Sequence, residues 1–143
     1  MRRGDLANLS ALIQNTLLVS NSADYELQTI ANLQRGFTVR AIRALARRRR
    51  IFVYVRDGKL AGTISLEGNR IHALFVAPDM QGLGIGRALM MFAESVAREK
   101  GGGELVLAAS LTAAGFYRRM GFGDSQPGGD DTYGPIIWMR KKL

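Results

Sequence analysis

Residues 74–87 read LFVAPDMQGLGIGR, a short apolar run followed by a turn that holds three glycines. The run is typical of a buried strand, and Pro78 ends it because proline cannot donate to a sheet ladder. Apolar residues then recur at helical spacing from Ile85 to Val96. A strand that leads through a glycine-rich turn into a helix presents free backbone N–H groups and the positive end of the helix dipole. The stretch therefore predicts an anion-binding turn.

The glycine spacing excludes two common nucleotide-binding motifs. A Walker-type loop ends in Gly-Lys-Ser/Thr, whereas Gly86 is followed by Arg87 and an alanine. A dinucleotide-binding turn needs GxGxxG after the first strand of a parallel unit, but Gly82, Gly84 and Gly86 are spaced by two. Without Cβ atoms, these glycines let the backbone approach a phosphate, and Arg87 adds a charged contact. A purely structural turn would explain the same glycines.

Upstream of this stretch, the sequence predicts three helices and an antiparallel meander. Asp5 is placed to cap a first helix, a second helical pattern ends at Gly36, and Thr38 is placed to cap a third. From Ile51 onward, β-branched and aromatic runs separated by turn residues predict a hairpin and a third strand that ends at Val76.

Downstream of the helix, the pattern predicts a buried strand over 104–110 and a short helix over 111–120. Residues 124–131, DSQPGGDD, predict a flexible loop before a last strand over 133–143. No internal repeat or linker interrupts the chain. We therefore expect a single domain over residues 1–143.

The composition excludes several classes of protein. The absence of cysteine and the single histidine exclude thiol enzymes and multi-histidine metal sites, and we expect no metal. No apolar run is long enough to cross a bilayer, and no apolar core of a signal peptide follows the first basic residues, so we expect a cytoplasmic protein without membrane contact.

The net charge of +8 favours a polyanionic partner: nucleic acid, an acidic membrane surface or a phosphorylated cofactor. The densest basic cluster is Arg47–Arg50. We interpret it as a solvated helix end, where cations complement the helix dipole, with a nucleic-acid patch as the alternative.

Two motifs in register resemble the GNAT acetyltransferase superfamily. The pattern Arg/Gln-x-x-Gly-x-Gly/Ala is met by residues 81–86, QGLGIG. The pattern Asn-x-x-Ala-x-x-Phe-Tyr is met by residues 110–117, SLTAAGFY, in which serine replaces the asparagine. The order and separation of the motifs also match, and the resemblance covers nearly the whole chain. It implies an α/β fold with a mixed, mostly antiparallel central sheet flanked by helices.

The resemblance implies acetyl-CoA as the cofactor, wedged where two central parallel strands splay apart. The strand backbone would hold the pantetheine arm and the thioester, and the amides of the glycine turn would hold the pyrophosphate. The cofactor-binding residues that it implies are Leu74, Phe75, Val76, Gln81, Gly82, Leu83, Gly84, Ile85, Gly86, Arg87 and Ser110. For the three strand residues, core packing of the side chains is the alternative.

The resemblance also implies transfer of the acetyl group to a primary amine of a small molecule or peptide. A backbone N–H near Val76 would stabilise the oxyanion, and Tyr117 would protonate the departing sulfur, unless it is a buried structural tyrosine. Where some members carry a glutamate base this chain has Leu105, and Glu104 would point to the opposite face. Glu67 is then the best candidate base, with a role as an exposed turn residue equally favoured.

The same residues leave two other functions open. Ser110 and Leu105 depart from the family pattern and favour a sensor that binds acetyl-CoA without catalysis. A basic RNA-binding adaptor is the second, although its basic residues are not interleaved with aromatic ones, so we expect no nucleic acid partner. We assign no role to His72.

The amine would bind near two acidic loops, residues 21–26 and Asp130-Asp131, although solvation explains their charges equally well. Only MRRG precedes the first helix, where family members usually have an edge strand. We therefore expect an exposed sheet edge that favours pairing in a homodimer.

Overall fold

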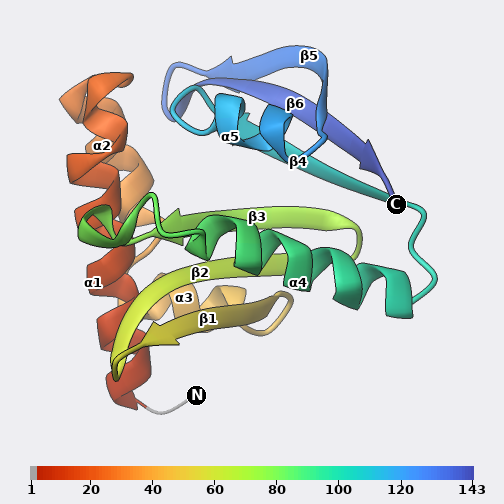
Figure 1. Cartoon of the computed structure of the whole chain (residues 1–143). Coiled ribbons are helices and arrows are strands. Elements are labelled where there is room, and N and C mark those ends of the chain that lie inside the picture. The colour runs from red at the N-terminus through yellow and green to blue at the C-terminus, as the bar shows by residue number, and fades with distance from the viewer. Residues whose placement is uncertain (1–2) are drawn as a thin grey trace.

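A computed structural model describes residues 3–143 as one sheet with helices on both faces (Figure 1). The helices are α1 (Arg3–Val19), α2 (Leu27–Arg35), α3 (Val39–Leu45), α4 (Ile85–Glu99) and α5 (Ala114–Arg119), with 3-10 turns η1 (Asn21–Ala23) and η2 (Pro78–Met80). The strands are β1 (Arg50–Arg56), β2 (Lys59–Glu67), β3 (Arg70–Val76), β4 (Glu104–Ser110), β5 (Gly123–Asp130) and β6 (Gly134–Lys142).

The six strands lie in the order β1-β2-β3-β4-β6-β5. Only β3 and β4 run parallel, and the other neighbouring pairs are antiparallel. The predicted fold class, a mixed and mostly antiparallel sheet flanked by helices, is confirmed. No helix within the described range is long and apolar enough to span a membrane.

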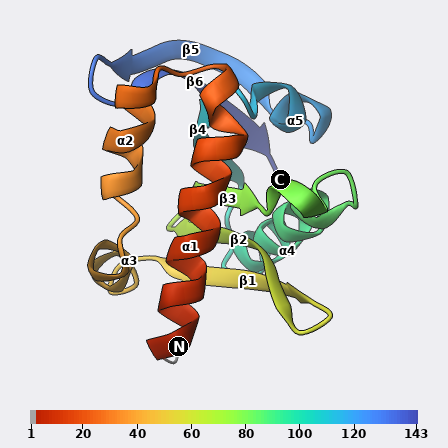
Figure 2. The same ribbon diagram turned by 90° about the vertical axis from the view of Figure 1, so that its left-hand side faces the viewer.

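Each face of the sheet has its own apolar core. On one face, an apolar stripe of α1 that includes Leu9, Ile13 and Leu17 packs with α2 and α3 (Figure 2). On the other face, α4 and α5 bury residues such as Met90 and Tyr117 against the sheet. Burial of these apolar faces on both sides fixes the position of the central strands.

The two central parallel strands stay paired for only a short distance. Their register joins Arg70 to Val106 and Ile71 to Leu107, after which β4 diverges from β3 (Figure 1). Here β3 carries a β-bulge that shifts its register against β2, and Ala73 has a φ of 51°. A bulge adds twist and bends its strand, so it helps to open the sheet at this point.

Several predicted boundaries hold and three do not. Thr38 caps α3 by accepting a hydrogen bond from Ala41 N at 3.1 Å, as predicted. The first helix begins at Arg3, so Asp5 lies in its first turn instead of capping it. The short helix α5 begins at Ala114, three residues later than predicted.

The third correction concerns residues 124–131, which were predicted to form a loop. They belong mostly to β5, an exposed edge strand that pairs with β6 along its length. Backbone pairing overrides the weak strand preference of this segment, and an edge position tolerates Pro127. Gly128 is also required, since a Cβ atom there would lie 2.7 Å from Trp138 Nε1.

The excess of positive over negative charge arises in one region of the sequence. Of the 20 Lys and Arg residues, nine lie between Arg35 and Lys59, together with one acidic residue. These nine residues are distributed over the end of α2, α3, its C-terminal turn and the β1–β2 hairpin. Arg47–Arg49 directly follow the end of α3, where the sequence placed them.

Candidate active site

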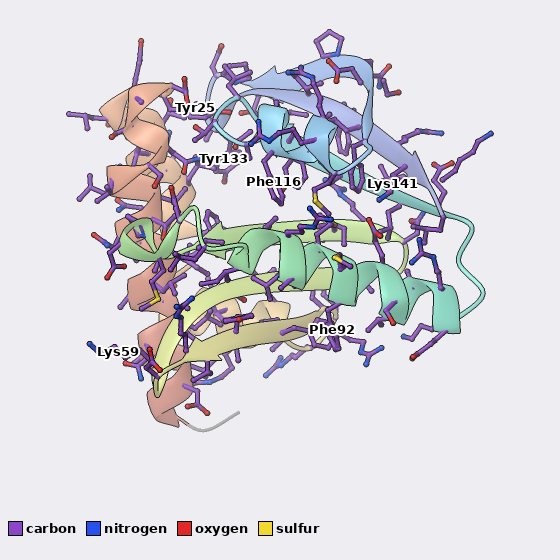
Figure 3. The ribbon with its side chains drawn as sticks, viewed as in Figure 1. Tyr25, Lys59, Phe92, Phe116, Tyr133 and Lys141 are labelled. Carbon is purple, nitrogen blue, oxygen red and sulfur yellow. The ribbon has the colours of Figure 1, made fainter. Side chains whose placement is uncertain are left out.

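A cavity of about 630 Å³ lies where β3 and β4 diverge. Its lining comes from both faces of the sheet, because consecutive side chains of β3 point to opposite faces. We call one part the α4–α5 half, lined by the glycine turn, Phe116, Tyr117 and Arg119. We call the other the α1–α2 half, lined by Asn21, Tyr25, Phe37, Phe75, Tyr133 and Ile136. Figure 3 shows Tyr133 and Phe116 between β3 and the β4–β6 part of the sheet, with Tyr25 beside the end of that part.

The glycine turn has the conformation of an anion cradle. Gly82 and Gly84 have φ values of 79° and 82°, a region that residues with a Cβ atom rarely adopt. Gly84 is the N-cap of α4, and no side chain caps that end, so the first N–H groups of the helix remain available to a ligand. Gly86 lies under Phe116, where an added Cβ atom would be 3.4 Å from the ring.

All but one of the predicted cofactor-binding residues line the cavity. The exception is Leu83, which has half of its surface exposed and is not part of the lining. The side-chain amide of Gln81 already has two hydrogen-bond partners in the protein. Its nitrogen donates to Val76 O at 3.1 Å and to Ser20 Oγ at 3.0 Å. Gln81 therefore joins the end of β3 to the segment that follows α1.

The backbone of Val76 faces the opening between the strands. Ala77 N donates to Ala61 O at 2.8 Å, so at this position β3 is still bonded to the strand on its other side. Because N–H directions alternate along a strand, the Val76 N–H points away from β2 and toward the divergent β4. The predicted oxyanion donor is thus directed into the cavity.

Two buried tyrosines differ in how their hydroxyl groups are used. Tyr25 donates to Pro135 O at 2.7 Å and accepts from Leu111 N at 2.9 Å. The Tyr117 hydroxyl, although the residue is only 6% exposed, makes no hydrogen bond to any other group of residues 3–143. Burial raises the pKa of both tyrosines above the ordinary value. Tyr117 thus keeps its proton at neutral pH and faces the cavity with it.

Ser110 stabilises the turn that leads into α5. Its Oγ accepts a hydrogen bond from Ala113 N at 3.1 Å. The two adjacent arginines of α5 have different surroundings. Arg119 lines the cavity, whereas Arg118 forms an ion pair with Asp124 at 2.8 Å. Arg119 was not predicted, because the consecutive arginines of RRMGF do not show which one faces inward.

Glu67 lies outside the cavity. It ends β2, five residues beyond Gly62, whose partner on β3 is Val76. At about 3.3 Å per residue, this places Glu67 roughly 16 Å along the strand from the Val76 N–H. Its carboxylate lies 3.7 Å from Arg48 and from Arg49. The structure therefore does not bring the candidate base to the site.

The single histidine, His72, lies beside Glu67 and not in the cavity. His72 Nε2 lies 3.3 Å from the Glu67 carboxylate, and burial with nearby arginines lowers the pKa of His72 to about 4. The family position for a glutamate base, Leu105, is fully buried in the core, in agreement with the sequence analysis.

The acidic loops do not supply a carboxylate to the cavity either. Asp24 accepts from the Thr112 hydroxyl at 2.8 Å, and Asp130 accepts from two backbone N–H groups of the β5–β6 turn. Among the described residues that line the cavity, the charged ones are Arg87 and Arg119. Both belong to the α4–α5 half.

A glycine turn at an uncapped helix end, a bulged strand and a cavity between two diverging strands define an α/β protein with an open site in the middle of a mixed sheet. The family model "Acetyltransferase (GNAT) domain" matches residues 21–143, and the chain belongs to this acetyltransferase family.

Relatives agree with this assignment. The chain is similar to the streptothricin acetyltransferase of Streptomyces lavendulae, with 42% identity over 83 residues. That match covers 51% of this chain and 44% of the relative, so the chain spans less than half the length of this curated relative.

Solved structures show the same fold. A GCN5-related N-acetyltransferase from Rhodopseudomonas palustris superposes with a TM-score of 0.93 at 22% identity, covering 100% of this chain and 92% of the other. The PaiA N-acetyltransferase from Thermoplasma acidophilum, solved in complex with coenzyme A, gives 0.80 at 21%, covering 100% and 96%.

Proposed function

We propose that this protein transfers an acetyl group from acetyl-CoA to a primary amine of a small molecule or peptide. The observation that carries the proposal is the cavity through the sheet, which places an uncapped glycine turn and a buried, protonated tyrosine on the same wall. Similarity to a streptothricin acetyltransferase supports a small-molecule acceptor.

The residues of the α4–α5 half fit coenzyme A. The free N–H groups at the start of α4 suit a pyrophosphate, and Arg87 and Arg119 are the charged side chains placed to meet phosphate oxygens. The pairing of β3 with β4 ends at Ile71, so the backbone groups of residues 74–76 on this side, apart from the Val76 carbonyl that Gln81 occupies, are available to the amide groups of a pantetheine arm.

When bound, acetyl-CoA supplies the acetyl group as a thioester, whose C–S bond breaks as the C–N bond to the amine forms and an amine proton is released. The Val76 N–H is directed to stabilise the negative charge that develops on the acetyl oxygen. Tyr117 holds a proton that the departing sulfur needs. The released amine proton passes to solvent, since no described lining residue is a carboxylate or a histidine.

The proposal also includes a cellular location and an oligomeric state. We place it in the cytoplasm, as the sequence indicates. We also expect β1, an edge strand of the described sheet, to be available for pairing with a second copy.

Calorimetric titration with acetyl-CoA, followed by a thiol-release assay over a panel of amines, tests the function. Binding together with release supports an acetyltransferase. Binding without release from any amine favours the sensor, and an absence of binding overturns the assignment of the α4–α5 half.

A further inference from the structure

The α1–α2 half of the cavity has an aromatic wall built from separate parts of the chain. Tyr25 follows η1, Phe75 belongs to β3, and Tyr133 lies in the β5–β6 turn. Phe37 packs edge-on against Phe75 with ring centroids 5.5 Å apart. Tyr133 is 50% exposed, so this ring lies at the mouth and not in the core. The wall offers flat apolar area of the kind that buries an aromatic group.

Asn21 is a largely buried polar side chain of this half without a hydrogen-bond partner among residues 3–143. Asn21 is only 7% exposed and lines the cavity, yet its amide makes no hydrogen bond to any group within residues 3–143. Its polar neighbours are engaged, because Ser20 accepts from Gln81, Thr16 donates to Leu12 O at 2.7 Å, and the Tyr25 hydroxyl has two partners. The Asn21 amide atoms are not among the fully buried unpaired atoms of the described residues, so this amide is accessible and available to a polar group of a ligand in the cavity.

The charges of the cavity all lie on the other side. Arg87 and Arg119 belong to the α4–α5 half, and the α1–α2 half is neutral in the described residues that line it. A polyamine carries several positive charges at neutral pH, because unperturbed alkylamines titrate near 10.4. To lose water from these charges without a carboxylate partner is costly. An amine with one amino group and an aromatic ring has to desolvate only one positive charge, so its desolvation cost is smaller.

We propose that the acceptor is a primary monoamine carried on an aromatic ring system, bound by the aromatic wall and by the free amide of Asn21. This inference rests on the acetyl transfer proposed above and names the class of its acceptor. The ring packs against Tyr133 and Phe75, and the amide of Asn21 accepts from or donates to a polar group of the amine substrate. Polycationic amines are poor acceptors.

The test measures binding before turnover. Phenethylamine and spermidine are titrated by calorimetry into the protein saturated with coenzyme A, and thiol release from acetyl-CoA is then measured with each amine. We expect phenethylamine to bind about tenfold more tightly than spermidine and to give the higher kcat/KM. Tyr133→Ala should remove most of this preference, whereas Tyr133→Phe keeps the ring and should preserve it.

A second variant tests Asn21. Asn21→Asp places a carboxylate in the neutral half with almost no change of shape and should raise the affinity for spermidine relative to phenethylamine by about tenfold. Equal or tighter binding of spermidine to the unmodified protein would overturn the inference, whether or not turnover occurs. The expected binding preference with no thiol release from either amine would instead contradict acetyl transfer and leave the aromatic binding site intact.

Discussion

The two halves of the cavity are built by different means. The α4–α5 half depends on backbone geometry, with glycines at positive φ, an uncapped helix end and the Val76 N–H, and it contains both charged lining residues. The α1–α2 half depends on side chains from distant parts of the sequence and is neutral. The α4–α5 half therefore fits the phosphates of the proposed coenzyme A, whereas the α1–α2 half offers mainly aromatic and aliphatic side chains, with the Asn21 amide, for selecting an amine.

The largest effect should come from disturbing the backbone of the α4–α5 half. Gly84→Val puts a β-branched residue at a φ of 82°, which moves the N–H groups at the start of α4. We expect the affinity for acetyl-CoA to fall about 100-fold or more, which corresponds to about 2.8 kcal/mol. Calorimetry measures this loss.

Gly58→Val is the matched control. Gly58 also has a positive φ, 74°, but it lies in the β1–β2 hairpin and is not part of the cavity lining. This variant should lose stability while it binds acetyl-CoA normally. Normal binding by Gly84→Val would exclude the glycine turn as the phosphate site.

The next comparison sets the buried tyrosines of the two halves against each other. Tyr117→Phe removes a hydroxyl without a hydrogen-bond partner among residues 3–143, so the melting temperature should hardly change, whereas kcat should fall about 100-fold through loss of the proton donor. Tyr25→Phe removes a hydroxyl with two partners and should cost about 1–3 kcal/mol of stability.

Thermal unfolding and steady-state kinetics on the same preparations separate the two roles. Because burial raises the pKa of Tyr117, the wild-type rate should not decline below pH 10 through loss of that proton. An unchanged kcat for Tyr117→Phe would assign this tyrosine a structural role only.

A smaller effect should distinguish the adjacent arginines of α5. Arg119 lines the α4–α5 half, whereas Arg118 is paired with Asp124 outside it. Arg119→Ala should weaken acetyl-CoA binding about tenfold, since a charge-assisted hydrogen bond contributes about 1.5–3 kcal/mol, and the loss should shrink at high salt. Arg118→Ala should bind as the wild type does. If both variants bind equally well, phosphate recognition depends on the backbone and Arg87.

The sequence predicted one half of the cavity much better than the other. The glycine turn and the Phe116-Tyr117 pair are local patterns, in which spacing along the chain fixes spacing in the structure. The aromatic wall joins Tyr25 to Tyr133, more than 100 residues apart, and only the folded chain brings them together. The strand β5 was missed for the same reason, because its conformation depends on β6 and not on its own residues.

The candidate base illustrates the limit of such patterns most clearly. Glu67 was selected because it ends a central strand, but the sequence does not show which end of the sheet that strand end faces. The register pairs Glu67 with Arg70, at the opposite end of β3 from Val76. Glu67→Gln should therefore leave kcat within about twofold of the wild type and cost about 0–1 kcal/mol of stability, as for other partly exposed ion pairs. Kinetics with Tyr117→Phe as the positive control measures this difference. A large loss of kcat for Glu67→Gln would mean that proton removal reaches across the sheet from a residue that lines neither half of the cavity.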